Sequence, residues 1–208
     1  MKLIGITTRI IKGDSGENIE KVPQSLLDKI KNNGGSAIII PCINNDCLFK
    51  ILKLCDGFII PGGNAFHEVD EIVIKYAISN DLPLLGICAG MQAIGNLENF
   101  VGSKESDKCY DLPNSLHMNK TSEFVHKVKF SDGILKKIFA TSELMVNSRH
   151  NQAIHPADFF TVEALSEDNV IEAIRVKNKK FIVGVQWHPE DMMTKESDML
   201  FRYFISLL

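Results

Sequence analysis

Residues 83–90 read PLLGICAG, and this stretch decides the fold of the 208-residue chain. The apolar run 83–88 is typical of a strand buried on both faces of a parallel sheet, and apolar residues at helical spacing follow it over 91–99. The Gly-x-Cys-x-Gly pattern at the junction predicts a sharp turn that presents the Cys88 side chain. The start of the following helix would favour the reactive thiolate there. Taken alone, the pattern fits a buried structural cysteine equally well.

Further predicted strands and helices lie on both sides of this stretch. Towards the N-terminus, predicted strands alternate with predicted helices at 2–7, 23–33, 36–41, 46–54, 57–60 and 69–77. The second half predicts further strands, a hairpin loop and a closing helix at 123–130, 160–165, 171–176, 177–180, 181–187 and 197–208. We therefore expect an α/β fold with a mostly parallel central sheet, helices on both faces and an antiparallel extension. No repeat or linker divides the chain, which favours a single domain over 1–208.

Composition excludes several classes of protein. Hydrophobic residues make up 45% of the chain and charged residues 24%, which is typical of a globular domain. The net charge of −3 gives no basic excess for nucleic acid. No apolar run reaches about 18 residues, so no membrane span is expected, and Arg9 interrupts the apolar start that a secretory signal needs. Five cysteines without a CxxC pair predict reduced thiols and a cytoplasmic protein.

Two further motifs follow predicted strands. In QWHPE, residues 186–190, Glu190 stands two residues after His188 and would hold its imidazole, which could take a thiol proton and return it to a leaving amine. Glycines in Pro61-Gly62-Gly63 let backbone amides approach a substrate oxygen. Each motif alone also fits a simple turn. However, both of these motifs and Cys88 follow strands, and the carboxyl edge of a parallel sheet is where ligands bind.

Together, the motifs PGG, GICAGMQ and QWHPE resemble those of class I glutamine amidotransferase-like proteins, a superfamily with a flavodoxin-like fold. Within it, the chain resembles the gamma-glutamyl-gamma-aminobutyrate hydrolase branch of the peptidase C26 family. The segments that carry this resemblance, in family order, are IGITTR (4–9), HKVKF (126–130), VNSRHNQAI (146–154), VIEAI (170–174) and GVQWHPE (184–190). The resemblance covers nearly the whole chain.

The resemblance implies a role for each matched residue. Cys88 would be the nucleophile, His188 the general base and acid, and Glu190 the residue that orients His188. The backbone amides of Gly63 and Ala89 would form the oxyanion hole. Further residues would hold the γ-glutamyl part of the substrate, with packing or a solvated loop as their alternative roles: Gln92, Ser148, Arg149 and His150. Asn151 stands where the family often has a second histidine. The resemblance implies no cofactor.

Two departures from the family concern the amine side of the substrate. Only residues 64–68 separate PGG from the next predicted helix, where the family usually inserts a longer loop. The usual glycine-rich Leu-x-Gln-Asp sequence is replaced by Gly-Ser-Lys at 102–104. Because a loop this short cannot fold over the site, we predict an open cleft beside Cys88, rimmed by 64–67 and 103–119.

The leading hypothesis is a cysteine hydrolase that cleaves the γ-glutamyl amide bond of a small metabolite and acts alone or as a homodimer. The alternative is a glutaminase module that delivers ammonia to a synthetase partner. A catalytically silent binding protein is the third class, and the complete triad argues against it. No metal site is expected, because the histidines outside the motifs show no metal-ligand spacing: His67, His117, His126 and His155.

Overall fold

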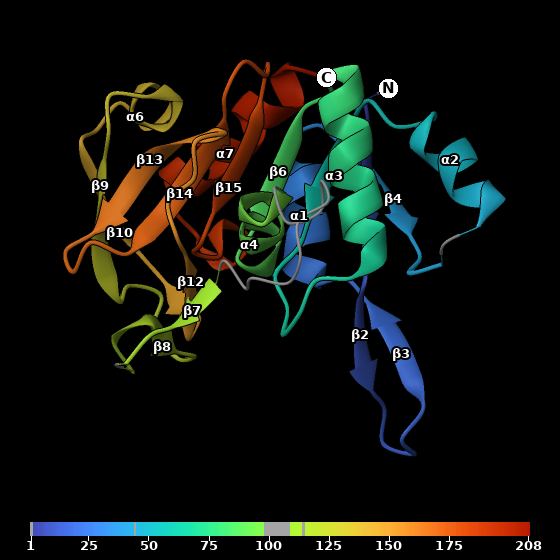
Figure 1. Cartoon of the computed structure of the whole chain (residues 1–208), viewed down its shortest axis with the longest axis horizontal. Helices are drawn as coiled ribbons and strands as arrows, with labels where there is room; N and C mark the ends of the chain where they lie inside the picture. Colours follow the sequence, from blue (N-terminus) through green and yellow to red (C-terminus); the bar gives the residue numbers. More distant parts are fainter. Residues whose placement is uncertain (1, 44, 98–108, 114) are drawn as a thin grey trace.

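The computed structural model describes residues 2–43, 45–97, 109–113 and 115–208. A nine-stranded sheet runs through it (Figure 1). In spatial order its strands are β10 (Glu143–Val146), β9 (His126–Phe130), β13 (Phe160–Ser166), β14 (Ile171–Val176), β15 (Ile182–Val185), β6 (Leu84–Ile87), β5 (Gly57–Ile60), β1 (Leu3–Thr7) and β4 (Ser36–Ile40). The five strands from β15 to β4 are parallel, and β14, β13, β9 and β10 extend the sheet in antiparallel fashion.

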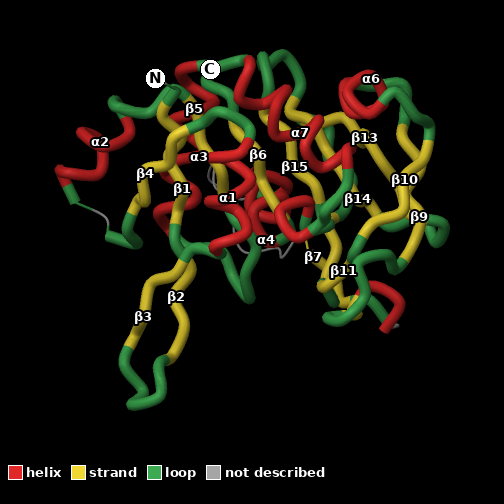
Figure 2. Tube along the Cα trace, turned by 180° about the vertical axis from the view of Figure 1, so that it is seen from behind, coloured by secondary structure: helices red, strands yellow, loops and turns green. Residues whose placement is uncertain are grey.

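Helices cover both faces of this sheet, as Figures 1 and 2 show from opposite sides. One face packs against α1 (Gln24–Asn32), α6 (Ile134–Phe139) and α7 (Lys195–Ser206). The other packs against α2 (Asp46–Leu52), α3 (Glu68–Asn80) and α4 (Ala89–Gly95). Strand β5 shows why the strands are apolar throughout, since Ile59 faces the first core while Phe58 and Ile60 face the second. The predicted fold class is therefore confirmed.

In the described part of the chain, three two-stranded sheets lie outside the main one. A hairpin of β2 (Arg9–Lys12) and β3 (Asn18–Lys21) projects from the molecule (Figure 1). Strand β7 (Cys109–Asp111) pairs with β12 (Gln152–Ile154), and β8 (Met118–Asn119) pairs with β11 (Ser148–Arg149). Two short 3-10 helices, η1 (Ser115–His117) and η2 (Pro189–Asp191), complete the described elements. None of these small elements, nor α6 and β10, is indicated by the sequence pattern.

The parallel strands place the predicted motifs at one edge. Strands β5, β6 and β15 are neighbours and point the same way, so their carboxyl ends meet. Pro61-Gly62-Gly63 follows β5, Cys88 follows β6, and His188 follows β15. The insertion after PGG is short, because α3 begins at Glu68 with His67 as its N-cap. Among the described residues, no helix has the length and apolar character needed to cross a membrane. The five cysteines all lie in the described part, and none of them forms a disulfide.

Candidate active site

Cys88 stands at a strained turn between β6 and α4. Its φ of 51° and ψ of −108° lie outside the regions that ordinary side chains prefer, a conformation that costs about 1–3 kcal/mol and is typical of functional sites. The flanking glycine explains how the turn fits. A Cβ on Gly90 would lie 2.1 Å from the carbonyl oxygen of Ile60, so only glycine allows α4 to approach β5 this closely. The cysteine is 5% exposed.

The side chains of Cys88, His188 and Glu190 come together as a contiguous set. His188 Nδ1 lies 2.8 Å from Glu190 Oε1, and the imidazole also forms a hydrogen bond with the Cys88 side chain. Burial acts to lower the pKa of His188. The charge of Glu190 and the hydrogen bonds to Cys88 and Glu190 outweigh burial, so the pKa of His188 stands well above its usual value. The imidazolium form that results would stabilise a neighbouring thiolate.

The Pro61–Gly63 segment packs directly against this pair of side chains. A Cβ on Gly62 would lie 2.5 Å from His188 Cε1 and 3.3 Å from Cys88 Cβ. A Cβ on Gly63 would lie 2.5 Å from Arg9 Cδ. Both positions therefore require glycine for space. Ala89, the first residue of α4, follows Cys88 directly. The backbone amides of Gly63 and Ala89 thus belong to the two segments that flank Cys88, and their role as an oxyanion hole stays a prediction.

A buried ion pair fixes the Pro61–Gly63 segment. Arg9 and Asp70 are 4% and 1% exposed, and Arg9 Nη1 lies 2.9 Å from Asp70 Oδ2. Arg9 Nη2 donates to the carbonyl oxygen of Pro61, and Asp70 also accepts from the Thr7 hydroxyl and the His67 amide. The sequence analysis gave neither residue a role at the site. The available signal was a charged residue, Arg9, within an apolar run.

Asn147 is a second positioning residue that the sequence analysis missed. Its amide Nδ2 donates to the carbonyl oxygen of His188, and its Oδ1 accepts from the His188 amide, both at 2.8 Å. Asn147 is fully buried. These two bonds fix the backbone that carries the imidazole.

The four predicted substrate-binding residues all have protein partners. Gln92 Nε2 donates to Gln152 O at 3.1 Å and to Gln186 Oε1 at 3.3 Å. The hydroxyl of Ser148 donates to the carbonyl oxygen of His117.

The other two substrate-binding candidates engage acidic side chains. Arg149 forms an ion pair with Asp191, the residue after Glu190, and this ion pair contributes to a lowered pKa of Asp191 that burial alone would raise. His150 Nδ1 lies 2.9 Å from Gln152 O, and its Nε2 faces Glu172. The substrate roles of all four residues stay predictions.

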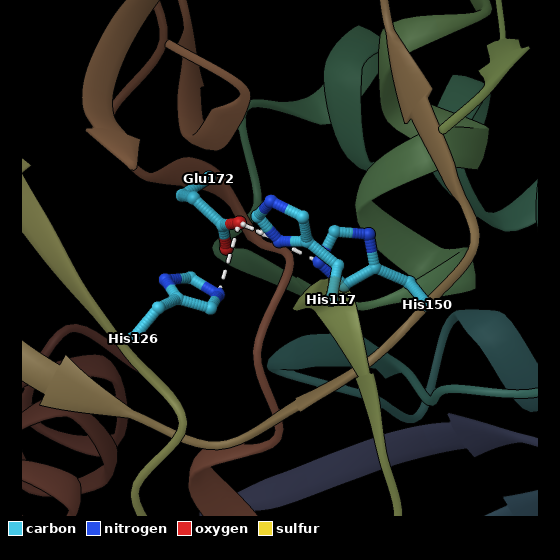
Figure 3. Close-up of side chains that lie close together, drawn as sticks. All are labelled: His117, His126, His150 and Glu172. Atoms are coloured by element: carbon cyan, nitrogen blue, oxygen red, sulfur yellow. Dashed lines mark ion pairs between the residues drawn. The ribbon is translucent and has the colours of Figure 1, made fainter. Parts of the chain in front are cut away.

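His150 belongs to a separate cluster with His117, His126 and Glu172 (Figure 3). Spacing along the sequence gave no sign of it, because its members come from η1, β9, β14 and the segment after β11. Burial would raise the pKa of Glu172, but the adjoining imidazoles hold it well below its usual range. One signal was available in the sequence: Glu172 interrupts an otherwise apolar run that forms a central strand.

Comparisons with known proteins show the family of this chain. A model of the Peptidase C26 family matches residues 64–190. A glutamine amidotransferase-like protein of Rickettsia prowazekii is 26% identical over 90% of each chain. Anthranilate synthase component 2 of Cyanophora paradoxa is 29% identical over 88% of this chain and 81% of its own.

Among solved structures, the glutaminase domain of Trypanosoma brucei CTPS with bound acivicin has a TM-score of 0.77. The two sequences are 17% identical, and the match covers 100% of this chain and 93% of the other. At this identity the similarity shows a shared fold. The chain thus belongs to the Peptidase C26 family, within the class I glutamine amidotransferase-like superfamily.

Proposed function

We propose that this protein is a cysteine-dependent amidase that hydrolyses the γ-carboxamide of glutamine to glutamate and ammonia. The observation that carries the proposal is the contact of Cys88 with His188, whose other ring nitrogen lies 2.8 Å from Glu190. A nucleophile, a base and an acidic residue that orients the base, joined in this order, perform acyl transfer on unrelated folds.

The reaction would run in two halves. The Cys88 thiolate attacks the γ-carbonyl carbon, and the amides of Gly63 and Ala89 hold the oxygen that becomes negative. Protonated His188 gives its proton to the amide nitrogen, the C–N bond breaks, and ammonia leaves a γ-glutamyl thioester on Cys88. Water then donates a proton to His188 and attacks the thioester, which releases glutamate and restores the thiol.

The choice of glutamine follows the alternative from the sequence rather than its leading hypothesis, which was a hydrolase of a small γ-glutamylated amine or metabolite. The names of the relatives support the alternative better, since they include a synthase component and a glutaminase domain. The short connection from PGG to α3 supports it as well. On this reading, the ammonia is delivered to a synthetase that is a separate chain or a further part of the same protein.

A γ-glutamyl hydrolase with a larger leaving group is the second candidate. A pocket of about 400 Å³ is lined by Phe66, Asn96, Cys109, Tyr110, Asp111 and Gln152. These residues come partly from the two segments predicted to rim an open cleft, although 103–108 and 114 of that rim lie outside the described residues. The backbone oxygen of Gln152 accepts from Gln92, which stands one helical turn after Cys88. The pocket therefore lies on the Gln92 side of the site and offers room for a leaving amine.

A substrate panel separates the two candidates. We expect kcat/KM to be highest for glutamine and to fall for γ-glutamyl amides of increasing leaving-group size, with Cys88→Ala inactive throughout. A synthetase encoded beside this gene should raise the glutaminase rate. A preference of more than about 100-fold for one larger γ-glutamyl amide, about 2.7 kcal/mol of transition-state binding, would instead establish the hydrolase. No turnover of any member, with or without the partner, would reject both.

A further inference from the structure

The cluster of His117, His126, His150 and Glu172 carries an inference independent of the amidase. We propose that these four side chains bind one zinc ion at a closed, structural site. Figure 3 shows the three imidazoles gathered around the Glu172 carboxylate. The fold brings them from four separate segments of the chain, and their ligand atoms all lie within 4.8 Å of one another.

The distances from Glu172 to the three histidines match those in a tetrahedral metal site. Glu172 Oε1 lies 3.2 Å from His117 Nδ1 and 3.4 Å from both His126 Nε2 and His150 Nε2. Zinc binds imidazole nitrogen and carboxylate oxygen at about 2.0–2.2 Å, so two ligands at neighbouring corners of a tetrahedron stand about 3.3–3.6 Å apart. The three distances from Glu172 therefore suit a tetrahedral ion, and the histidine nitrogens, all within 4.8 Å of one another, would close around it.

Each imidazole has an inner nitrogen, which faces Glu172, and an outer nitrogen, which points away from it. The outer nitrogen of each imidazole already faces an oxygen atom. His117 Nε2 lies 3.0 Å from Asp168 Oδ2, and His150 Nδ1 lies 2.9 Å from Gln152 O. His126 Nδ1 lies 3.4 Å from Lys127 O. In a neutral imidazole these contacts place the proton on the outer nitrogen and leave a lone pair on the inner one. Metal-bound histidines are held in this way by a carboxylate or a carbonyl group.

At the centre of the cluster, the ligand atoms of the four described residues face one another as ion pairs but make no hydrogen bond of normal geometry. Among the described residues, all three inner nitrogens and both oxygens of Glu172 are buried without a hydrogen bond, although they lie close together. The side chains of His117 and His150 are each 2% exposed, and that of Glu172 is fully buried. Buried polar atoms are rarely left in this state, and a cation would bind the three nitrogens and one oxygen of Glu172 at once. Protonation of the histidines is the alternative to a bound cation. However, several protonated imidazoles this close together would repel one another.

The donor set and the position indicate a structural zinc ion. Three imidazoles and one carboxylate suit zinc and not Mg²⁺ or Ca²⁺, and four protein ligands leave no open position for water. Glu172 lies in β14 and Cys88 directly follows β6, and these two strands flank β15. Gln186 N donates to Glu172 O, and Cys88 N donates to Val185 O. Two strand spacings separate Glu172 from Cys88, about 10 Å, so the ion would not touch the thiol. It would instead join β14 to the segment that follows β11.

The test is a metal titration of chelator-treated, full-length protein. Binding of Zn²⁺ is measured by competition with a chromophoric chelator, and Co²⁺ serves as a visible-absorption probe of tetrahedral geometry. We expect one ion per chain, a tetrahedral Co²⁺ spectrum, and no competition by Mg²⁺ or Ca²⁺. At free zinc about 100-fold above Kd, the unfolding midpoint should rise by about 5–10 °C.

Four variants locate the ion. Glu172→Gln and His126→Gln each remove one ligand and should weaken zinc binding at least about 100-fold, with loss of the Co²⁺ spectrum. His155→Gln is the matched control, because it removes an exposed histidine that does not belong to the cluster. The ring centroids of His155 and Tyr110 lie 4.6 Å apart. Asp191→Asn tests the other possible group, formed by His188, Glu190 and Asp191. Both controls should bind zinc as the wild type does.

Three results would overturn the proposal. Unchanged binding in Glu172→Gln and His126→Gln would place the ion elsewhere, and loss of binding in Asp191→Asn alone would place it at the active site. Absence of one-to-one binding in the wild type at micromolar zinc would mean that the cluster holds only protons. If Glu172→Gln does not fold, as judged by circular dichroism, the half-buried His126 carries the test.

Discussion

His188 is held through its ring and its backbone, and its ring contacts set its proton affinity. Burial lowers the pKa of His188, but the charge of Glu190 and the hydrogen bonds to Cys88 and Glu190 raise it well above 6.5. A group whose pKa is raised in the folded state stabilises the fold fully below its unfolded pKa, and this stabilisation is lost as the pH rises through the folded-state pKa. The triad should therefore contribute most to stability on the acidic side.

Glu190→Gln tests this sign. The variant keeps the shape of the side chain and removes its charge, so the wild type should exceed it in unfolding free energy by more at about pH 6 than at about pH 9. Urea denaturation at the two pH values measures the difference. Glutaminase activity should fall by about 10²–10⁴-fold, because the imidazole loses its orienting charge. An equal stability difference at both pH values would mean that Glu190 does not raise the pKa of His188.

Asn147 positions His188 without reaching the substrate. Replacing Asn147 by Ala leaves the buried amide and carbonyl of His188 without partners, which should lower the unfolding free energy by about 1–3 kcal/mol. We expect kcat to fall more than about 10-fold with KM nearly unchanged. Asn80→Ala is the control, since the exposed Asn80 also donates to a backbone oxygen, that of Tyr76, and should cost less than about 0.5 kcal/mol. Equal costs for both variants would show that Asn147 has no special positioning role.

Helix α3 offers a sharp comparison between a buried and an exposed ion pair. Asp70 pairs with buried Arg9, whereas the next residue, Glu71, pairs with Lys75 on the surface. Asp70→Asn leaves the guanidinium without its counter-charge and should cost about 3–5 kcal/mol. Glu71→Gln should change stability by less than about 0.5 kcal/mol. Asp70→Asn should also reduce turnover, because Arg9 holds the carbonyl oxygen of Pro61. Similar unfolding free energies for the two variants would contradict this account.

The sheet and its main helices could be predicted because their residues carry strong local patterns. Strands such as β5 and β6 are continuous apolar runs, and α1 begins after Pro23 and is followed by Gly34 at a φ of +87°. The small sheets could not be predicted in this way. Strands β8 and β11 have two residues each and exist only because they pair with each other. The β2–β3 hairpin is mostly exposed, so no apolar face marks it.

The motif residues of the site could be predicted because each follows a buried strand at the same edge. The residues that hold them could not, because their partners are distant in sequence. Arg9 and Asp70 are 61 residues apart, and Asn147 is 41 residues from His188. The proposed zinc site was not predicted from the sequence for the same reason, since its four residues come from separate segments of the chain. Charged or polar side chains within apolar runs, such as Arg9 and Glu172, are the sequence signal for such long-range contacts.

The account of the molecule depends on a covalent intermediate on Cys88, which mass spectrometry can detect directly. Wild-type protein is mixed with glutamine, quenched in acid within the first turnover, and digested for peptide mapping. We predict a γ-glutamyl thioester on the peptide that contains Cys88, formed and lost at rates consistent with turnover, and no adduct in Cys88→Ala. Glutamine turnover without an adduct on Cys88, together with an active Cys88→Ala variant, would contradict the account.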